Sequence, residues 1–555
     1  VVVLLVAAIA GRLLVDFGKK PKKGRTPEKG RAVLVLVLGV VLAFRTISTT
    51  RSLPSLGKAA KDAPNLLLVT LDTTRADYIG WHQSFSREHE KASTTEFPAM
   101  DAQTPAFDQL ADAGVGFAAA MSQIPVTGPS HATILSGQGP WDHGILLNGV
   151  AVDPALPIMS ETLRGAGYQS AAFVSAFVLD GDLGFSRGFS VYDDDFGWLQ
   201  GWSDTVPGRI WAMLGRRLDP HEVVERKGKR TVNGALRWLE SHGKRKFGDE
   251  GWPIETPPFF LWVHLFDAHG PYQPPPPWDT AFYSGDPTDP AHASMAEAKD
   301  IAPYLADSLS GITDANWVRT QYAGEIAAAD AELARLLQWL EHNDREEDTL
   351  VVVVGDHGEN LGEHDIWFNH GSDLFDTSLH VPLAMRFPGR ISAGNVVTDP
   401  VELTDVSATI YELLGVDKPP TVYGDSLVPS LFGVPGAAFA RSLCFDREAN
   451  LAGRTAGELD RPTHRMASLR TTAGRYLFRQ ASGYEEAFFD ASTNPLQLLP
   501  IDDSGLEILS EQTLNDYRHH AKTMIGAVST EQLDRTSAEL DAETRAKLEA
   551  LGYIE

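Results

Sequence analysis

Three short apolar runs, each ending in acidic residues or histidine, constrain the fold of this chain more than any other feature. They are NLLLVTLDTTRADYIG from Asn65, FFLWVHLFDAHGPY from Phe259 and TLVVVVGDHGEN from Thr349. Runs of this length without alternation are typical of strands buried on both faces, as in parallel sheets. From Gly324, apolar residues recur at spacings of three and four, which predicts a helix. The chain is therefore predicted to be an α/β protein with a mostly parallel, doubly wound sheet flanked by helices.

The end of each run carries residues that can bind a metal ion or transfer a proton. These residues are Asp72, Asp267, His269, Asp356 and His357, and His370 follows in FNHG. Ligands of open α/β sheets bind beyond the carboxyl ends of the strands. Carboxylates and imidazoles from separate strands would form a site there for a hard or borderline divalent cation. Taken singly, each residue has a structural alternative, since such an Asp often caps a helix and a histidine is often satisfied in a core.

The segment PVTGPSHATILSG, residues 125–137, adds a hydroxyl group to this set. Its Gly-Pro-Ser turn precedes an apolar helical stretch, and a helix amino terminus offers backbone N–H groups and the positive end of a dipole to an anion. Thr127 at this turn would ionise more easily beside a divalent metal and become a nucleophile. The alternative is that Thr127 or Ser130 only caps the helix.

Further segments occur in the order found in the sulfatase branch of the alkaline phosphatase superfamily. They include TPAFDQLADAGVGF, TGPSHATILSGQGPWDHGI, GYQSAAFVSA, LHVPL, LTDVSATIYELLGV and the closing LGY. The chain resembles this family from about Asn65 to Tyr553. The resemblance implies an alkaline phosphatase-like fold and a metal-dependent ester hydrolase. It also implies one divalent ion, which would be held by Asp72, Thr127, Asp356 and His357.

The same resemblance implies roles for two further histidines. His269 matches the family histidine that contacts the transferred group or protonates the leaving group. His370 falls near a lysine position of the sulfatases, and would contact the anion or hold a second metal with Asp267. Two-zinc phosphodiesterases have a histidine four residues after that aspartate, where this chain has Pro271. That difference argues against a full second metal site.

The nucleophile motif departs from the sulfatase pattern. The family motif C/S-x-P-S-R-A reads T-G-P-S-H-A here, so Thr127 stands where sulfatases carry the residue converted to formylglycine, and His131 stands at the arginine. The only cysteine is Cys444, and no formylglycine is expected. Ser175 replaces the lysine of the following family segment. Two positive charges that hold a sulfate in typical members are therefore absent, although His131 remains a candidate catalytic residue.

These departures favour phosphoryl chemistry. A threonine nucleophile resembles the phosphodiesterase, nucleotide pyrophosphatase and phosphoethanolamine-transferase branches, and the Asp356-His357 pair resembles the phosphatase and phosphonate-ester branches. Thr73 stands where sulfatases have a second aspartate, which favours zinc or manganese over calcium. The predicted reaction is attack by Thr127 on a phosphate diester, a phosphonate or a sulfate ester, through a covalent intermediate. A phosphoryl transferase of the envelope, a sulfuric ester hydrolase and an inactive binding ectodomain are the alternatives.

Charge divides the chain sharply. Residues 1–51 hold ten basic and two acidic residues, a net charge of +8, whereas the whole chain carries −26. Two apolar runs flank a basic loop at 18–31, which predicts transmembrane segment(s) within 1–45, with this loop on the cytoplasmic side. A signal-peptide core and a buried helix are the competing interpretations. On the membrane interpretation, the catalytic domain is anchored and extracytoplasmic, either periplasmic or extracellular.

The remainder divides into a linker at 46–64, a sulfatase-like catalytic domain at 65–438 and a small α+β subdomain at 439–555. In this subdomain, RYLFRQ and EEAFFDAS predict strands of an antiparallel sheet, and a charged helix is expected to end in ALGYIE. The acidic balance outside the first 51 residues argues against a nucleic-acid partner. The expected substrate is a small-molecule, lipid or glycan ester.

Overall fold

The computed structural model describes residues 56–60, 62–89, 100, 102–196, 225–247, 253–254, 256–446, 464–480, 484–490, 506 and 509–528. The predicted membrane segments at 1–45 and the helix expected to end in ALGYIE lie outside these residues. Within the described ranges, no helix has both the length and the apolar character needed to cross a bilayer.

The three apolar runs form adjacent strands at the centre of an eight-stranded sheet. These strands are β1 (Asn65–Leu71), β8 (Phe259–Leu265) and β9 (Thr349–Gly355). The sheet order is β14-β2-β13-β9-β1-β8-β4-β5. The outer members are β2 (Val115–Phe117), β4 (Gln169–Phe173), β5 (Val191–Asp193), β13 (Leu383–Arg386) and β14 (Asn395–Val397). Because β13 runs antiparallel to β9 and β2, the sheet is mixed around a parallel centre.

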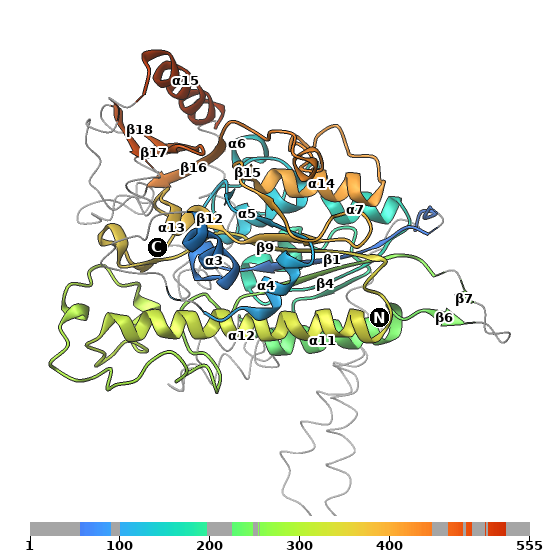
Figure 1. The fold of residues 1–555 in the computed structure, drawn as a ribbon, viewed down its shortest axis with the longest axis horizontal. Helices are drawn as coiled ribbons and strands as arrows, with labels where there is room; N and C mark the ends of the chain where they lie inside the picture. The colour runs from blue at the N-terminus through green and yellow to red at the C-terminus, as the bar shows by residue number, and fades with distance from the viewer. Residues whose placement is uncertain are drawn as a thin grey trace, which may run out of the picture. The chain divides into compact units, whose positions relative to one another are not determined.

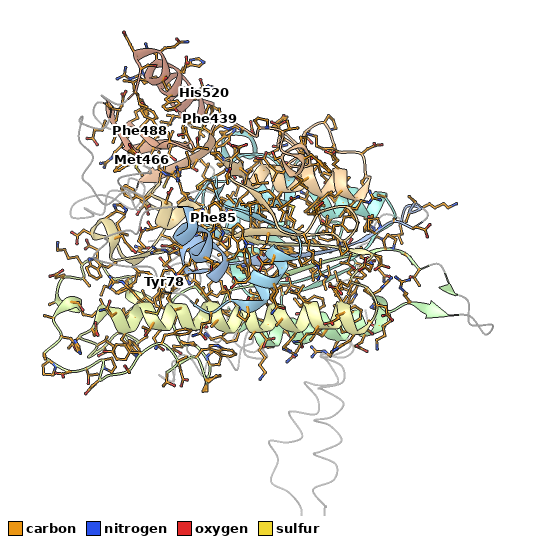
Figure 2. All side chains as sticks on the ribbon, viewed as in Figure 1. Tyr78, Phe85, Phe439, Met466, Phe488 and His520 are labelled. Carbon is orange, nitrogen blue, oxygen red and sulfur yellow. The ribbon has the colours of Figure 1, made fainter. Side chains whose placement is uncertain are left out.

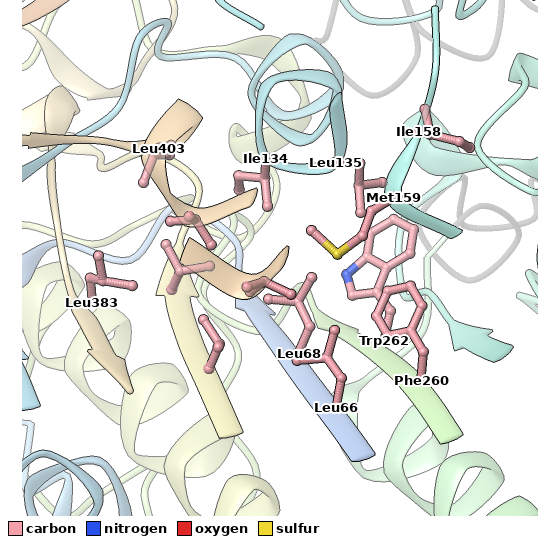
Figure 3. Packing of buried hydrophobic residues seen from close by; sticks show 14 of the residues in the cluster. Leu66, Leu68, Ile134, Leu135, Ile158, Met159, Phe260, Trp262, Leu383 and Leu403 are labelled. Carbon is pink, nitrogen blue, oxygen red and sulfur yellow. The ribbon is translucent and has the colours of Figure 1, made fainter. Parts of the chain in front are cut away.

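Burial on both faces explains the unbroken apolar runs. Leu66 and Leu68 of β1 belong to the core on one face, and Leu67 and Val69 belong to the core on the other. Figure 3 shows Leu66 and Leu68 beside Phe260 and Trp262 of β8, with Ile134, Leu135 and Met159 lying over them. Fully burying such a side chain contributes about 1.5–3 kcal/mol. Substitutions that expose or charge this centre would therefore unfold the sheet.

Helices cover both faces of the sheet (Figure 1). On one face lie α5 (Thr127–Ser136), α7 (Met159–Gly165) and α14 (Leu403–Leu414). On the other face lie α3 (Gly80–His89), α4 (Pro105–Asp112), α11 (Gly228–His242) and α12 (Ala315–His342). The helix predicted from Gly324 is confirmed as part of α12. The predicted doubly wound α/β architecture is therefore correct.

Smaller elements surround this core. Two short helices are α6 (Pro140–His143) and α13 (Asp376–Leu379). A three-stranded sheet joins β3 (Ala120–Met121), β12 (His380–Val381) and β15 (Val401–Glu402). Two-stranded sheets pair β6 (Lys246–Phe247) with β7 (Pro253–Ile254), and β10 (Asn360–Leu361) with β11 (Trp367–Asn369).

A second, antiparallel sheet forms near the carboxyl end of the chain. It consists of β16 (Ala440–Asp446), β17 (His464–Arg470), β18 (Gly474–Gln480) and β19 (Tyr484–Asp490). The segments RYLFRQ and EEAFFDAS fall in β18 and β19, as predicted. Helix α15 (Glu511–Ala527) covers this sheet, and the rings of Phe439 and His520 lie 4.8 Å apart there (Figure 2). The described residues from Leu56 onward belong to one compact unit.

Candidate active site

The site forms where β1 and β9 end side by side. Leu71 is paired with Gly355, so Asp72 and Asp356 emerge from neighbouring strands at the same edge of the sheet. One oxygen of each carboxylate and one ring nitrogen of His357 lie within 4.8 Å of one another. All three side chains are fully buried. The parallel centre of the sheet therefore assembles a compact acidic cluster from residues almost 300 positions apart.

Each carboxylate has one oxygen engaged by the protein. Oδ2 of Asp72 is 3.1 Å from Nε2 of His264, and Oδ1 of Asp356 accepts backbone N–H groups from Thr73 and His357 at 3.1 and 2.7 Å. The second oxygens, Asp72 Oδ1 and Asp356 Oδ2, have no hydrogen-bond partner within the described part of the chain. Buried polar atoms are rarely left without a partner. These two oxygens therefore mark the place where a cation fits.

The pKa values of the two carboxylates also indicate a place for a cation. Burial raises the pKa of Asp72 to about 7, although nearby His131 and His370 act in the opposite direction. Burial and the charge of Asp72 raise the pKa of Asp356 well above its ordinary value. Without a cation, two such carboxylates disfavour each other's ionised form. A divalent ion would remove this penalty.

The tautomer of His357 suits a ligand. Its Nδ1 lies 2.9 Å from the carbonyl oxygen of Gly358, which can only accept a hydrogen bond, so the neutral ring carries its proton on Nδ1. The lone pair of Nε2 then faces the cluster, 3.6 Å from Asp356 Oδ2 and 4.0 Å from Asp72 Oδ1. Fixing the unused nitrogen in this way is how metal-binding histidines are usually oriented.

Thr127 joins the cluster from another element. It is the first residue of α5, and its Oγ1 lies 3.1 Å from Nε2 of His357. Neither Thr127 nor Ser130 caps the helix. Instead, Oδ1 of Asn148 accepts the N–H of Gly128 at 2.7 Å, and the Ser130 hydroxyl donates to the carbonyl oxygen of Asp356 at 2.8 Å. The Thr127 hydroxyl is therefore directed to the acidic cluster rather than to the helix backbone.

Thr73 is strained at this edge of the sheet. Its φ of +46° lies in the left-handed region, which is unfavourable for a β-branched residue. This conformation points its N–H to Asp356, while its carbonyl oxygen accepts the hydroxyl of Tyr322 at 2.6 Å. Strain of this kind costs on the order of 1–3 kcal/mol and concentrates at functional sites. It persists here because the surrounding contacts fix both Asp356 and Thr73.

His131 lies beside the cluster, with its Nδ1 3.6 Å from Oδ2 of Asp356. Its Nδ1 donates to the carbonyl oxygen of Thr127 at 2.8 Å, and its Nε2 lies 3.0 Å from the hydroxyl of Thr70. Burial lowers its pKa to about 3, so the ring is neutral. With both nitrogens engaged and no exposed surface, His131 supports the first turn of α5. Both ring nitrogens are engaged by the protein, and a catalytic role for His131 stays a prediction.

His269 and His370 lie close together near His357. The ring centroids of His357 and His370 are 4.5 Å apart, and those of His370 and His269 are 5.2 Å apart. His370 Nδ1 is 3.2 Å from an oxygen of Glu359. Burial alone would lower the pKa of His370, but the charge and hydrogen bond of Glu359 raise it overall. Glu359 therefore favours the protonated form of His370, whose ring lies beside that of His357.

Asp267 has a different role. Both of its carboxylate oxygens accept the N–H of Gly228, at 2.9 and 3.1 Å, at the beginning of α11. Burial raises the pKa of Asp267, although Lys227 and this N–H act against it. Since His370 pairs with Glu359, the structure does not join Asp267 and His370 into a second metal site. Asp267 instead accepts the first backbone N–H of α11, although the N-cap residue of that helix is Lys227.

Two buried residues of the site were missed from the sequence, His264 and Glu359. His264 interrupts the apolar run FFLWVHL, and a polar residue in a strand buried on both faces is the signal that could have found it. Glu359 follows the Asp356-His357 pair by two residues, but no pattern connects it with His370. Burial lowers the pKa of His264 to about 3, so this ring is neutral.

The donor set fits a divalent ion. Asp72 and Asp356 would supply oxygen, His357 would supply nitrogen, and the hydroxyl of Thr127 lies beside them. Mixed oxygen and nitrogen donors suit zinc or manganese. An ion here would act as a Lewis acid toward an ester oxygen and the Thr127 hydroxyl.

A model of one protein family, described as Sulfatase, matches residues 64–416. This chain belongs to the sulfatase family. The match covers the whole eight-stranded sheet and every residue of the cluster just described. Sulfatase-family enzymes depend on a metal, which agrees with the fit of the donor set. The sulfatase-like chain is therefore an ester hydrolase.

Individual relatives include both sulfatases and other members of the superfamily. A multifunctional alkaline phosphatase superfamily protein of Trinickia caryophylli is 25% identical over 414 residues, covering 66% of this chain and 77% of the relative. An arylsulfatase of Clostridium perfringens is 23% identical over 476 residues, covering 78% and 89%. The solved structure of the phosphonate monoester hydrolase of Agrobacterium radiobacter aligns with a TM-score of 0.57 at 20% identity, covering 84% and 95%. This structural likeness supports the alkaline phosphatase-like fold.

Proposed function

We propose that this sulfatase-family chain hydrolyses phosphonate monoesters or phosphate diesters, with Thr127 as the nucleophile. The observation that carries the proposal is the position of Thr127. Its hydroxyl stands at the amino terminus of α5, 3.1 Å from Nε2 of His357 and beside two buried carboxylates that need a cation. A hydroxyl used only for structure would cap the helix, and Asn148 serves that end instead.

The reaction follows from the neighbours of Thr127. A divalent ion, when bound, supplies positive charge that lowers the pKa of the Thr127 hydroxyl and offsets charge on the ester oxygens. Thr127 Oγ1 forms a bond to phosphorus, and the bond from phosphorus to the alcohol oxygen breaks. The α5 amino terminus favours the negative charge of the transferred group. The hydroxyl proton of Thr127 passes to solvent, His269 is the proposed donor of a proton to the leaving alcohol, and His269 regains its proton from solvent. Water then cleaves the Thr127 ester and restores the hydroxyl.

His370 would contact the anion in this scheme. Its ring lies 4.5 Å from that of His357, and Glu359 holds it from behind. This pair takes over the role that cationic residues have in typical sulfatases. Because His131 and Ser175 supply no charge, His370, whose protonated form Glu359 favours, is the residue we propose for contact with the anion.

Sulfate esters are the second candidate, and the arylsulfatase relative favours them. We rank them lower because a sulfothreonine lacks the second hydroxyl by which a formylglycine hydrate releases sulfate. The proposed reaction uses the unmodified Thr127 hydroxyl and involves no formylglycine. Transfer of the phosphoryl group to an acceptor alcohol instead of water is the further alternative, and an inactive binding ectodomain is the last. The natural alcohol is proposed to be a small molecule, a lipid or a glycan.

We also propose that residues 1–45 anchor the enzyme in a membrane, with the catalytic domain outside the cytoplasm. The charge pattern of this segment supports the proposal. Protease accessibility of the catalytic domain in intact cells or spheroplasts tests it, and a catalytic domain protected inside the cytoplasm would contradict it.

The test of the reaction is turnover of four aryl esters by the purified protein. A bis-aryl phosphate, an aryl phosphonate, an aryl monophosphate and an aryl sulfate are compared with zinc, manganese or calcium added in turn. We expect the phosphodiester or phosphonate to be preferred, and Thr127→Ala to lower kcat by at least about a thousandfold. Thr127→Ser is the matched control, since it keeps the hydroxyl. Full turnover in Thr127→Ala would exclude the nucleophile, and preference for the aryl sulfate would favour the second candidate.

A further inference from the structure

His264 connects the acidic cluster to the neighbouring strand. It lies within β8, where it is paired with Thr70 of β1, and its side chain is fully buried. The ring lies between Asp72, at the end of β1, and Ser175, which follows β4. Three adjacent strands of the parallel centre thus meet through one imidazole.

The hydrogen bonds fix the tautomer of this ring. The backbone N–H of Ser175 donates to Nδ1 at 3.3 Å, so Nδ1 carries no proton. The proton of the neutral ring is therefore on Nε2, which donates to Oδ2 of Asp72 at 3.1 Å. Ser175 is itself held in place, because its hydroxyl donates to the carbonyl oxygen of His264 at 2.7 Å. The direction of the N–H toward Asp72 is thus set by backbone groups.

This contact selects which oxygen of Asp72 faces the cluster. With Oδ2 held by His264, Oδ1 is the oxygen that lies 4.0 Å from Nε2 of His357 and has no hydrogen-bond partner among the described residues. A carboxylate without such a contact could rotate and present either oxygen. Outer contacts of this kind commonly change metal affinity by 10–100-fold.

From this arrangement we propose that His264 is a positioning residue for the divalent cation, which orients Asp72 so that Oδ1 binds the ion. The proposal rests on the cation of the proposed function and extends it to a residue that touches neither the ester nor the ion. The residue acts through Asp72 alone.

The chemistry of the contact also matters. Ser175 matches the position of a lysine in typical sulfatases, and His131 matches the position of an arginine. The rings of His131 and His264 lie 4.9 Å apart. A cation in this space would pair with Asp72 and compete with a metal for its charge. A neutral N–H donor orients the carboxylate and leaves its negative charge to the ion. With His131 and Ser175 in place of those two cations, the negative charge of Asp72 is left to the metal.

A pair of amide variants separates the two hydrogen bonds of His264. His264→Gln places an N–H near the position of Nε2 and keeps the contact with Asp72. His264→Asn reaches only the position of Nδ1, so it keeps the contact with Ser175 and loses Asp72. Calorimetric titration of the purified, metal-free proteins with Zn²⁺ measures affinity directly. We expect His264→Asn to bind Zn²⁺ about 10–100-fold more weakly than the wild type, and His264→Gln to stay within about threefold.

Two control variants show whether a change in Zn²⁺ affinity is specific to the contact between His264 and Asp72. His82→Gln changes another buried histidine, whose ring lies beside His380, and should leave Zn²⁺ affinity unchanged. Asp72→Asn removes a ligand and should abolish binding. With Co²⁺ as a spectroscopic probe, His264→Asn should alter the visible absorption of the bound ion, whereas His82→Gln should not. At saturating Zn²⁺, His264→Asn should recover most of its kcat, because its defect lies in holding the ion.

Several results would overturn the inference. Equal Zn²⁺ affinity in the wild type and in His264→Asn, with Asp72→Asn still defective, would leave the metal site intact and exclude a role for His264. Failure of the wild type to bind Zn²⁺, Mn²⁺, Ca²⁺ or Co²⁺ would remove both the cation and the inference. If His264→Asn does not fold, anomalous diffraction from wild-type crystals with Zn²⁺ shows which oxygen of Asp72 binds the ion. Zinc on Oδ1 of Asp72, with Oδ2 still on His264, supports the proposal, and zinc bound to both oxygens or to His264 contradicts it.

Discussion

Buried carboxylates at two places in this protein are balanced in opposite ways. At the carboxyl ends of β1 and β9, Asp72 and Asp356 lie together, and each keeps one oxygen without a partner among the described residues. At the beginning of α13, Asp376 is paired with Arg475 of β18 and lies 3.3 Å from Nε of Arg470. Burial raises the pKa of Asp72 to about 7. Burial alone would also raise the pKa of Asp376, but Arg475 and Arg470 lower it far below its ordinary value.

The difference teaches how to separate a structural acid from a ligand. At both places the carboxylates are buried, although charged residues are normally excluded from a protein core. Where the protein supplies its own cation, the acid holds two parts of the chain together, here the C-terminal sheet and the segment that follows His370. At Asp72 and Asp356 no lysine or arginine among the described residues is paired with the acids, and one oxygen of each is left without a hydrogen-bond partner, so a bound cation would supply the remaining positive charge. An acidic cluster without a counter-charge is therefore the stronger indication of a metal site.

The largest expected effect comes from removing the protein's own cation. Arg475→Leu leaves Asp376 buried without its main partner, and we expect it to lower the free energy of unfolding by about 3–5 kcal/mol. Urea denaturation measures the loss. The double variant Arg475→Leu with Asp376→Leu is the control, and it should recover most of the stability because no buried charge is left alone. A loss of less than about 1 kcal/mol in the single variant would contradict the assignment.

Removing the bound metal ion should lower the free energy of unfolding by less than Arg475→Leu does. Replacing the acid Asp356, in contrast, should not destabilise the metal-free protein. Zn²⁺ at one hundred times its Kd should stabilise the wild type by about 2.7 kcal/mol. Asp356→Asn should lose that gain, yet in chelator it should be at least as stable as the wild type, because it relieves the repulsion between two buried carboxylates. Thermal unfolding with Zn²⁺ or with chelator tests both statements. Destabilisation of Asp356→Asn in chelator would show that the cluster is structural.

The pH dependence sharpens the comparison further. Because the folded-state pKa of Asp376 is lowered, its stabilising contribution is present above the unfolded value of about 3.9 and is lost as pH falls below it. In Arg475→Leu, burial is no longer offset by Arg475, so Asp376 takes up a proton at a higher pH than in the wild type, and the stability difference should narrow as pH falls, by at most about 1.4 kcal/mol per pH unit. Urea denaturation at pH 7, 5, 4 and 3.5 follows this difference. A gap that stays constant down to the lowest pH would exclude Asp376 as the partner of Arg475.

The smallest effect is expected at an ion pair on the surface. Lys299 Nζ lies 2.9 Å from an oxygen of Asp365, and both side chains are largely exposed. Water screens such a pair, so Lys299→Ala should not move the urea midpoint beyond experimental error. A clear loss of stability would mean that distance, rather than burial, decides the strength of ion pairs in this protein. The contrast between the buried Asp376 and the surface pair would then not hold.

Much of the fold was predictable because its signals are local. Each central strand is long, apolar and followed by polar residues, and burial on both faces requires that pattern wherever such a strand occurs. Asp72, Asp356 and His357 could be named for the same reason, since strand ends of a parallel sheet meet at one edge. The antiparallel direction of β13 was not predictable, because four residues carry no signal of direction.

Sequence determined which chemical groups the site contains, and the tertiary structure decided what each one does. Thr127 and His131 were predicted as catalytic groups and Asp267 as a possible metal ligand. In the structure Thr127 faces the acidic cluster, His131 hydrogen-bonds within α5, and Asp267 accepts the first backbone N–H of α11. The partnerships of His264 with Asp72 and of His370 with Glu359 also emerge only in three dimensions. The physical reason is that a residue's role depends on which hydrogen-bond partners and charges surround it. Those partners are set by packing between distant segments, which local sequence does not encode.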